Sequence, residues 1–181
     1  MSGQLQHWQT LFAQKLGGMQ AQLETELRAS IACCIQDFNA MGYAISIGED
    51  LELASPIAIT CPHPAAQHKP DAVPRNCDPM EWPDWHHKHF LGYAQRYDEM
   101  YQACRQEYDL FEDCSFTLQG EAFMLALHAM YLDSMQKMPA AFPSMRYWAI
   151  TIPDSEYAIV TDSIKRLNTP EVLQKMNLAD L

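Results

Sequence analysis

Closely spaced glycines are absent from this sequence. Its seven glycines are scattered, apart from the pair Gly17-Gly18, whereas loops that bind phosphate groups need glycines close together so that backbone N–H groups can approach the anion. The Gly-x-Ser-x-Gly pattern that forms the nucleophile turn of the α/β-hydrolases is missing as well. These absences argue against the common nucleotide-dependent and hydrolytic enzymes, and we predict no catalytic residue and no cofactor.

Positive charge is also scarce. The chain has 12 lysines and arginines against 23 aspartates and glutamates, which gives a formal net charge of -11 at pH 7. A protein of this charge repels phosphate backbones and anionic lipids, so we expect neither nucleic acid nor membrane as a partner. A basic protein is the favoured partner, because opposite charges accelerate encounter and fix orientation.

Long apolar runs are missing too. No stretch approaches the length of a membrane span, and the first residues have neither the basic start nor the apolar run of a secretory signal. The six cysteines, of which Cys33 and Cys34 are adjacent, show no even framework for disulfides. We therefore expect a cytoplasmic protein with free thiols. Its 181 residues suffice for a single domain, 1–181, with a continuous core.

The period of the apolar residues changes once in the first half of the chain. From residue 19 they recur at helical spacing, which predicts an amphipathic helix with one buried stripe, namely Leu23, Leu27, Ile31, Cys34 and Phe38. Gly17-Gly18 should separate this helix from a shorter one over residues 5–16, because paired glycines are poor helix interior. Alternation over residues 43–47 and the apolar run 57–60 then predict two strands that pair as a hairpin.

Two long helices are predicted in the second half. Apolar residues over 90–108 are spaced by three and four positions, with Asp84 as the N-cap of the helix. Three tyrosines on this stripe, Tyr97, Tyr101 and Tyr108, predict a wide and partly wet helix face. A further helix over about residues 117–138 should end at Pro139.

The C-terminal part adds a strand and two helices. Residues 147–152 predict a strand whose Ile150 lies in the core with Phe123 and Leu127. A helix through residue 167 should begin at Asp154 or Ser155, and the last helix should begin with Thr169 as N-cap. The whole pattern predicts an α+β fold, with a small, mostly antiparallel sheet packed against several amphipathic helices.

A proline-rich loop over about residues 61–83 separates the predicted hairpin from these helices. It contains six of the eleven prolines, a density that excludes a helix and a central strand. With the residues that follow, it holds the best candidate metal ligands, namely Cys61, His63, Cys77, His86 and His89. Their spacing matches no standard zinc motif, so we prefer to interpret the histidines as facing solvent, and we rank a Cys–His nucleophile pair below the metal site.

Acidic residues next to apolar ones give the candidate partner-binding sites. The first choice is the run 107–113, where carboxylates without a compensating base surround apolar anchors. The second choice is the region of residues 81–85, although large aromatics beside Pro83 more often anchor a loop to the core. The predicted contact residues are Glu107, Tyr108, Asp109, Phe111, Glu112, Asp113, Glu81, Trp82 and Trp85, with Leu110 as a further apolar anchor. Solvated acidic surface is the alternative interpretation.

Three short blocks resemble a bacterial family, domain-of-unknown-function family 4303. They are Gly42-Tyr-Ala-Ile-Ser-Ile47, Pro79-Met-Glu-Trp82 and Ala149-Ile-Thr-Ile-Pro-Asp-Ser155 with Leu167-Asn168. The resemblance implies a bacterial origin and one compact α/β-type domain, similar to small acidic proteins that act as antidotes to secreted toxins. The sequence thus favours a cytoplasmic immunity protein that occludes the active site of a cognate toxin. The alternative is a zinc-binding or hydrolytic enzyme centred on the Cys/His-rich segment 61–89.

Overall fold

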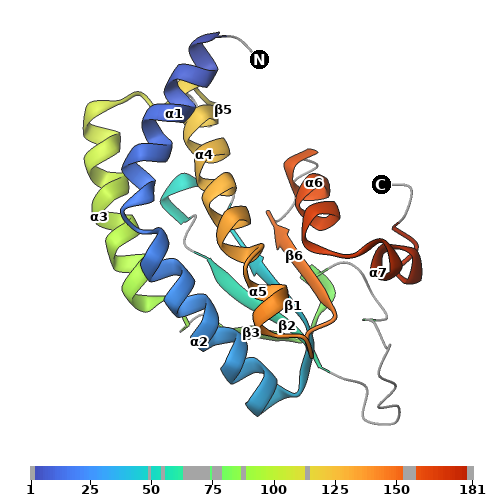
Figure 1. Ribbon diagram of the computed structural model, residues 1–181. Helices are drawn as coiled ribbons and strands as arrows, with labels where there is room; N and C mark the ends of the chain where they lie inside the picture. The colour runs from blue at the N-terminus through green and yellow to red at the C-terminus, as the bar shows by residue number, and fades with distance from the viewer. Residues whose placement is uncertain are drawn as a thin grey trace.

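Helices cover one face of a small sheet in the computed structural model, and a shorter helical segment covers part of the other face (Figure 1). The structure describes residues 3–48, 50–53, 56–62, 74, 79–86, 89–112, 115–152 and 158–178. The predicted α+β class is confirmed.

The main sheet has four strands in the order β3-β2-β1-β6. These strands are β1 (Ala40–Ser46), β2 (Ile57–Pro62), β3 (Asp84–His86) and β6 (Tyr147–Thr151). β1 and β2 form the predicted antiparallel hairpin, and β3 continues it in the antiparallel sense. β6 pairs with β1 in parallel, so the sheet is mixed although most of its pairings are antiparallel.

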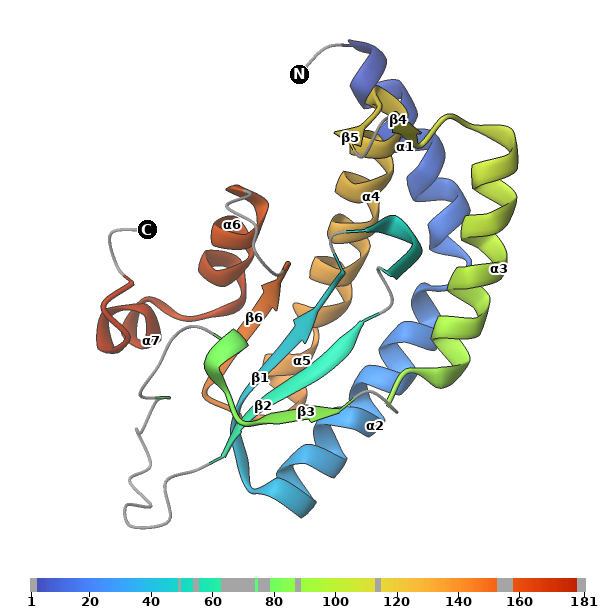
Figure 2. The same cartoon turned by 180° about the vertical axis from the view of Figure 1, so that it is seen from behind.

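The helices divide between the two faces of the sheet. They are α1 (Gly3–Gly17), α2 (Gln20–Phe38), α3 (Leu91–Glu107), α4 (Leu118–Met135), α5 (Met138–Ala141), α6 (Ala158–Leu167) and α7 (Pro170–Lys175). Figure 2 shows α2 and α4 behind the strands, α1 above them, α3 to their side, and α6 and α7 beside β6. Shorter elements are η1 (Leu51–Leu53), η2 (Pro79–Glu81), β4 (Phe111–Glu112) and β5 (Ser115–Phe116). The predicted break between α1 and α2 at the glycine pair is confirmed.

Two apolar clusters lie on the two faces of the sheet. The larger cluster includes Ile150 with Phe123 and Leu127, as predicted. The smaller one holds Ala149 and Trp82 on the opposite face. Because both faces are covered, all 7 residues of β1 are buried. The strands therefore form the centre of the molecule and fix the position of the segments at the sheet edges.

The start of α3 differs from the prediction. Asp84 is not its N-cap, because it belongs to β3, and the helix begins at Leu91. A carboxylate from α2 takes over the capping role, since Glu26 accepts the backbone N–H of Tyr93 at 3.1 Å. Gly92 permits this approach, because a Cβ added there would lie 2.5 Å from a carboxylate oxygen of Glu26.

The tyrosine face of α3 is drier than predicted. Tyr97 and Tyr101 are each only 1% exposed, so the predicted wet face is wrong for both. Their rings stack on each other with centroids 6.1 Å apart. The hydroxyl of Tyr97 donates a hydrogen bond to the Leu51 carbonyl. This bond replaces the hydrogen bond to water that the buried Tyr97 hydroxyl cannot make.

The helix boundaries of the C-terminal half are partly as predicted. α4 ends at Met135, and Pro139 does not end it but lies in the first turn of α5, where proline is well tolerated. Thr169 caps α7 as predicted and accepts the backbone N–H of Val172 at 3.4 Å. The caps proposed at 154 and 155 lie outside the described residues. Within the described ranges, no helix combines the length and apolar character that a bilayer crossing requires.

Candidate partner-binding surface

The first predicted binding region is the end of α3 and the β4–β5 hairpin, which hydrogen bonds hold in place. The backbone N–H of Asp109 donates to Gln119 Oε1 at 2.9 Å, and the Thr117 hydroxyl donates to the Asp109 carbonyl. At Gly120, an added Cβ would lie 2.0 Å from the Leu110 carbonyl oxygen. The start of α4 therefore packs closely against the segment that leads from α3 into β4.

A compensating base is present in this region, contrary to the prediction. Lys15 from α1 lies 2.9 Å from a carboxylate oxygen of Glu107. The Tyr108 hydroxyl donates to Glu107 at 2.6 Å. The hydrogen bonds from Tyr108 and then Lys15 lower the pKa of Glu107. Glu107 is therefore partly neutralised within the protein, whereas Asp109 and Glu112 are exposed carboxylates in the described part of this region.

The apolar residues of this region face its own core. Leu110 is 2% exposed. Tyr108 packs on Phe12 with ring centroids 5.3 Å apart, and Phe111 packs on Phe116 at the same distance. Asp113, the remaining predicted contact, lies outside the described residues. The hairpin thus presents negative charge, but its apolar side chains are largely used for folding.

The second predicted region contains one buried and one exposed tryptophan. Trp82 is 3% exposed and its ring lies 5.7 Å from that of Tyr147, so it anchors the segment to the sheet. Trp85 in β3 is 37% exposed. Its indole N–H donates to the Trp82 carbonyl at 3.1 Å, which fixes the ring. Glu81, which precedes Trp82, is also exposed.

The two predicted regions lie at opposite ends of the molecule. Figure 2 shows β4 and β5 beside the start of α1, whereas β3 lies beside the far end of α2. The sequence suggested both as contact sites but gave no indication of their separation. A small partner that binds one of them does not contact the other.

The Cys/His set does not converge on one site within the described residues. Cys61 packs with the cluster that contains Trp82, whereas His86 bonds Thr60 on the helix-covered face of the sheet, at 3.1 Å. Cys61 and His86 therefore point to opposite faces. His63 and Cys77 lie outside the described residues, and in the described part of the chain no three metal-ligating side chains form a cluster.

The chemistry of these side chains also disfavours a nucleophile or a shared metal ion. Burial raises the pKa of Cys61 to about 11, so the thiol stays protonated at neutral pH. The rings of His86 and His89 are stacked, with centroids 5.0 Å apart and planes 3° from parallel. Because imidazole lone pairs lie in the ring plane, stacked parallel rings do not direct them to one ion.

The hydroxyl groups of Ser30 and Tyr43 connect His89 to the core. Ser30 Oγ lies 2.6 Å from His89 Nδ1 and 2.8 Å from the Tyr43 hydroxyl. Burial and the neighbouring His86 both lower the pKa of His89. His89 is therefore fixed to the core, and its surroundings favour the neutral ring.

Phe38 completes an exposed aromatic surface that the sequence did not indicate. It was predicted to continue the buried stripe of α2, but it is 37% exposed and its ring lies 4.4 Å from that of His86. Leu91, two residues after His89, is 66% exposed. We name the two sides of this strand together the β3 edge surface. It is formed by Phe38, His86, His89 and Leu91 with the carboxylates of Asp37 and Asp84, and by Trp85 on the opposite face of the strand with Glu81 in η2.

A signal for this surface does exist in the sequence. Phe38 is the last residue of its helix, directly before Asn39, which has the left-handed φ of 49° common just after a helix end. The last apolar residue of a helix can extend beyond the elements that pack against the helix. Helical spacing alone therefore does not predict that this residue is buried.

Comparison with protein-family models, curated proteins and solved structures finds no match to this chain. The functional argument therefore depends on the surface itself.

Proposed function

We propose that this protein binds a partner protein with a basic surface through the β3 edge surface. The observation that carries the proposal is the exposure of aromatic rings on both sides of β3, with Phe38 packed on His86 on one side and Trp85 on the other. Trp85 and Phe38 are each 37% exposed, and Asp37 beside Phe38 in the sequence and Glu81 in η2 are exposed as well. Protein interfaces concentrate their binding energy in such aromatic residues, surrounded by a polar rim.

The rigidity of this surface supports binding. The indole N–H of Trp85 is hydrogen-bonded to the Trp82 carbonyl, and Trp82 packs on the sheet. His89 is hydrogen-bonded to Ser30, which is in turn hydrogen-bonded to the buried Tyr43. A partner that binds here does not have to order these groups, so less conformational entropy is lost on association.

The kind of partner follows from the charge. With a net charge of -11, the protein attracts a basic surface from a distance, whatever the contact residues. We propose that the protein is a cytoplasmic immunity protein of bacterial origin, related to domain-of-unknown-function family 4303, which neutralises a secreted toxin by covering its active site.

A toxin-protection assay with the neighbouring gene of the host, combined with copurification of its product, tests this function. The double variant F38A/W85A should lose protection and bind the toxin at least about tenfold more weakly, as loss of hot-spot residues does. The matched control is L118A, because Leu118 is similarly exposed, at 38%, and lies at the hairpin end of α4. L118A should protect like the wild type.

Three results would count against the proposal. Equal protection by F38A/W85A and L118A would show that the contact lies elsewhere. Loss of protection by L118A alone would place it at the hairpin end. If the wild type neither protects nor copurifies with a partner, the immunity function is wrong.

A further inference from the structure

Trp85 can offer a partner its aromatic ring but not its indole N–H, because the N–H already donates a hydrogen bond within the protein. The indole N–H donates to the Trp82 carbonyl at 3.1 Å, so it is committed within the protein while 37% of the residue remains exposed. An indole that is held in this way offers a partner its π face and edge. The face of an aromatic ring carries negative electrostatic potential and attracts cations.

The ring pair on the other side of β3 has the same character. His86 and His89 direct one ring nitrogen each to Thr60 and Ser30, and Phe38 packs against His86. Trp85 pairs with Ile59 on the opposite face of the sheet, so aromatic groups border both sides of this strand. Asp84 shares the face of His86, because the two residues flank Trp85 in β3, and the exposed Glu81 of η2 precedes Trp85 in the sequence.

A flat, exposed ring selects between the two basic side chains. A guanidinium group is planar, stacks on aromatic rings and is weakly hydrated, whereas an ammonium group is a compact and strongly hydrated charge. We infer that the β3 edge surface recognises an arginine of the partner, which stacks on the exposed ring of Trp85. This inference rests on the proposed function and specifies the chemistry of the same surface.

The test compares two blocked peptides of equal charge, hexaarginine and hexalysine, by calorimetric titration. Both are attracted by the net charge of -11, so the informative quantity is the ratio of their affinities. Wild-type protein should bind hexaarginine about two- to fivefold more tightly than hexalysine, as a partly exposed cation–π contact provides. In W85L the ratio should fall to about one, while W85F, which keeps a ring face, should retain part of the preference.

Indole N–H resonances locate the peptide. The resonance of Trp85 reports peptide binding near β3. The resonance of Trp8, whose ring lies 5.7 Å from that of Tyr108, reports binding near the β4–β5 hairpin. The hexaarginine peptide should shift the Trp85 resonance and leave that of Trp8 in place. The charge-reversal control D98K/E99K on the exposed side of α3 should weaken both peptides without changing their ratio.

The inference is wrong if the ratio is one in the wild type, if W85L keeps the wild-type ratio, or if Trp8 shifts in place of Trp85. These outcomes do not depend on any host partner, so they are separate from a failure of the toxin-protection assay. A toxin that binds while the peptide ratio is one would leave the proposed function standing and remove the arginine contact.

Discussion

The side chain of Asn168 bonds both backbone groups of Trp148. The Trp148 N–H donates to Asn168 Oδ1 at 2.9 Å, and Asn168 Nδ2 donates to the Trp148 carbonyl at 2.7 Å. The same Nδ2 donates to the Ile164 carbonyl at 2.8 Å. The amide thus occupies the outer edge of β6 in the way that another strand would, and it joins the sheet to the end of α6.

Asn168→Ala should therefore destabilise the protein by about 1–3 kcal/mol, because it leaves strand and helix groups without their partner. Asn168→Asp should be no better, since a carboxylate cannot donate to the two carbonyls. Urea denaturation measures the effect, with the exposed Gln136→Ala as control. A midpoint for Asn168→Ala equal to that of the control would show that water replaces the amide without cost.

The Trp82 ring lies close to the backbone of β1 at Gly42. A Cβ added to Gly42 would lie 2.8 Å from Trp82 Cη2, 3.0 Å from Pro74 Cγ and 3.2 Å from Cys61 Cβ. Gly42→Ala should cost about 1–3 kcal/mol, as overpacking does. Gly18→Ala is the matched control, because an added Cβ there meets nothing within 4 Å.

A double-mutant cycle identifies the cause of that cost. If the Trp82 ring is the obstacle, Gly42→Ala should cost less in a Trp82→Ala background, and the coupling should approach the size of the single-mutant effect. Additive effects of the two substitutions would instead assign the cost to the backbone of β1.

Strong local patterns were sufficient to predict much of the fold. The apolar run of β6, the helical spacing of α2 and the Thr169 cap each follow from residues close in sequence. The three-residue strand β3 was missed because it lies directly after Pro83 in a proline-rich segment, and its pairing with β2 is a long-range contact. Contacts between distant residues, such as Lys15 with Glu107, leave no periodic signal in a single sequence.

Ile150 tests the buried side of β6. It is 0% exposed and belongs to the same cluster as Phe123 and Leu127. Ile150→Ala should destabilise the protein by about 2–5 kcal/mol, through lost burial and the cavity that remains. Equilibrium denaturation by guanidinium provides the measurement, and a change smaller than about 1 kcal/mol would contradict the described packing.

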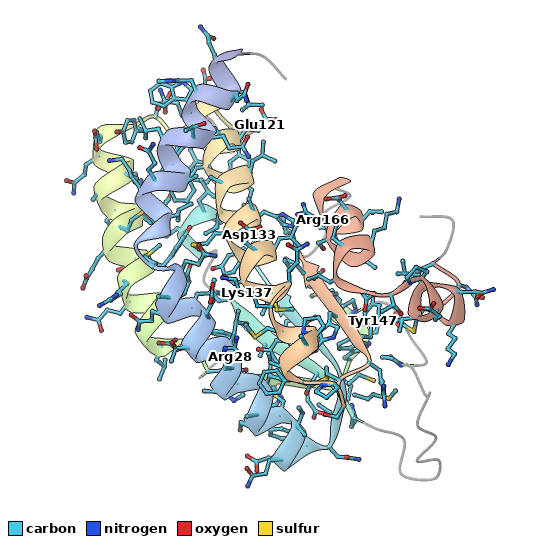
Figure 3. The ribbon with its side chains drawn as sticks, viewed as in Figure 1. Arg28, Glu121, Asp133, Lys137, Tyr147 and Arg166 are labelled. Carbon is cyan, nitrogen blue, oxygen red and sulfur yellow. The ribbon has the colours of Figure 1, made fainter. Side chains whose placement is uncertain are left out.

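His128 on α4 should make stability depend on pH. It is 4% exposed, and within the described residues its Nε2 has no hydrogen-bond partner. Burial lowers its pKa to about 4, aided by Arg166 and opposed by Asp162, both on α6. Figure 3 shows Arg166 on the α6 side of the junction with α4. The folded state therefore favours the neutral ring.

The sign of the effect follows from this pKa. His128 binds its proton near pH 6.5 in the unfolded chain but only near pH 4 in the folded chain. The stability of the folded state is therefore not reduced by His128 above pH 6.5, and it falls as the pH drops toward 4. The loss amounts to about 3 kcal/mol at most, at 1.36 kcal/mol per pH unit. In His128→Leu the difference in stability between pH 7 and pH 4.5 should shrink accordingly. An unchanged difference would show that other groups cause it.

Charge reversal at the hairpin distinguishes the long-range effect of net charge on association from a direct contact with the partner at the hairpin. D109K/E112K and D98K/E99K each change the net charge from -11 to -7, because each replaces two acidic residues by two basic ones. All four positions are exposed, so neither variant should unfold the protein. If the partner docks at the β3 edge surface, the two variants should slow association with the basic partner to a similar extent and flatten its salt dependence alike. Stopped-flow association rates at low salt measure this, and a slower rate for D109K/E112K alone would place the docking site at the hairpin after all.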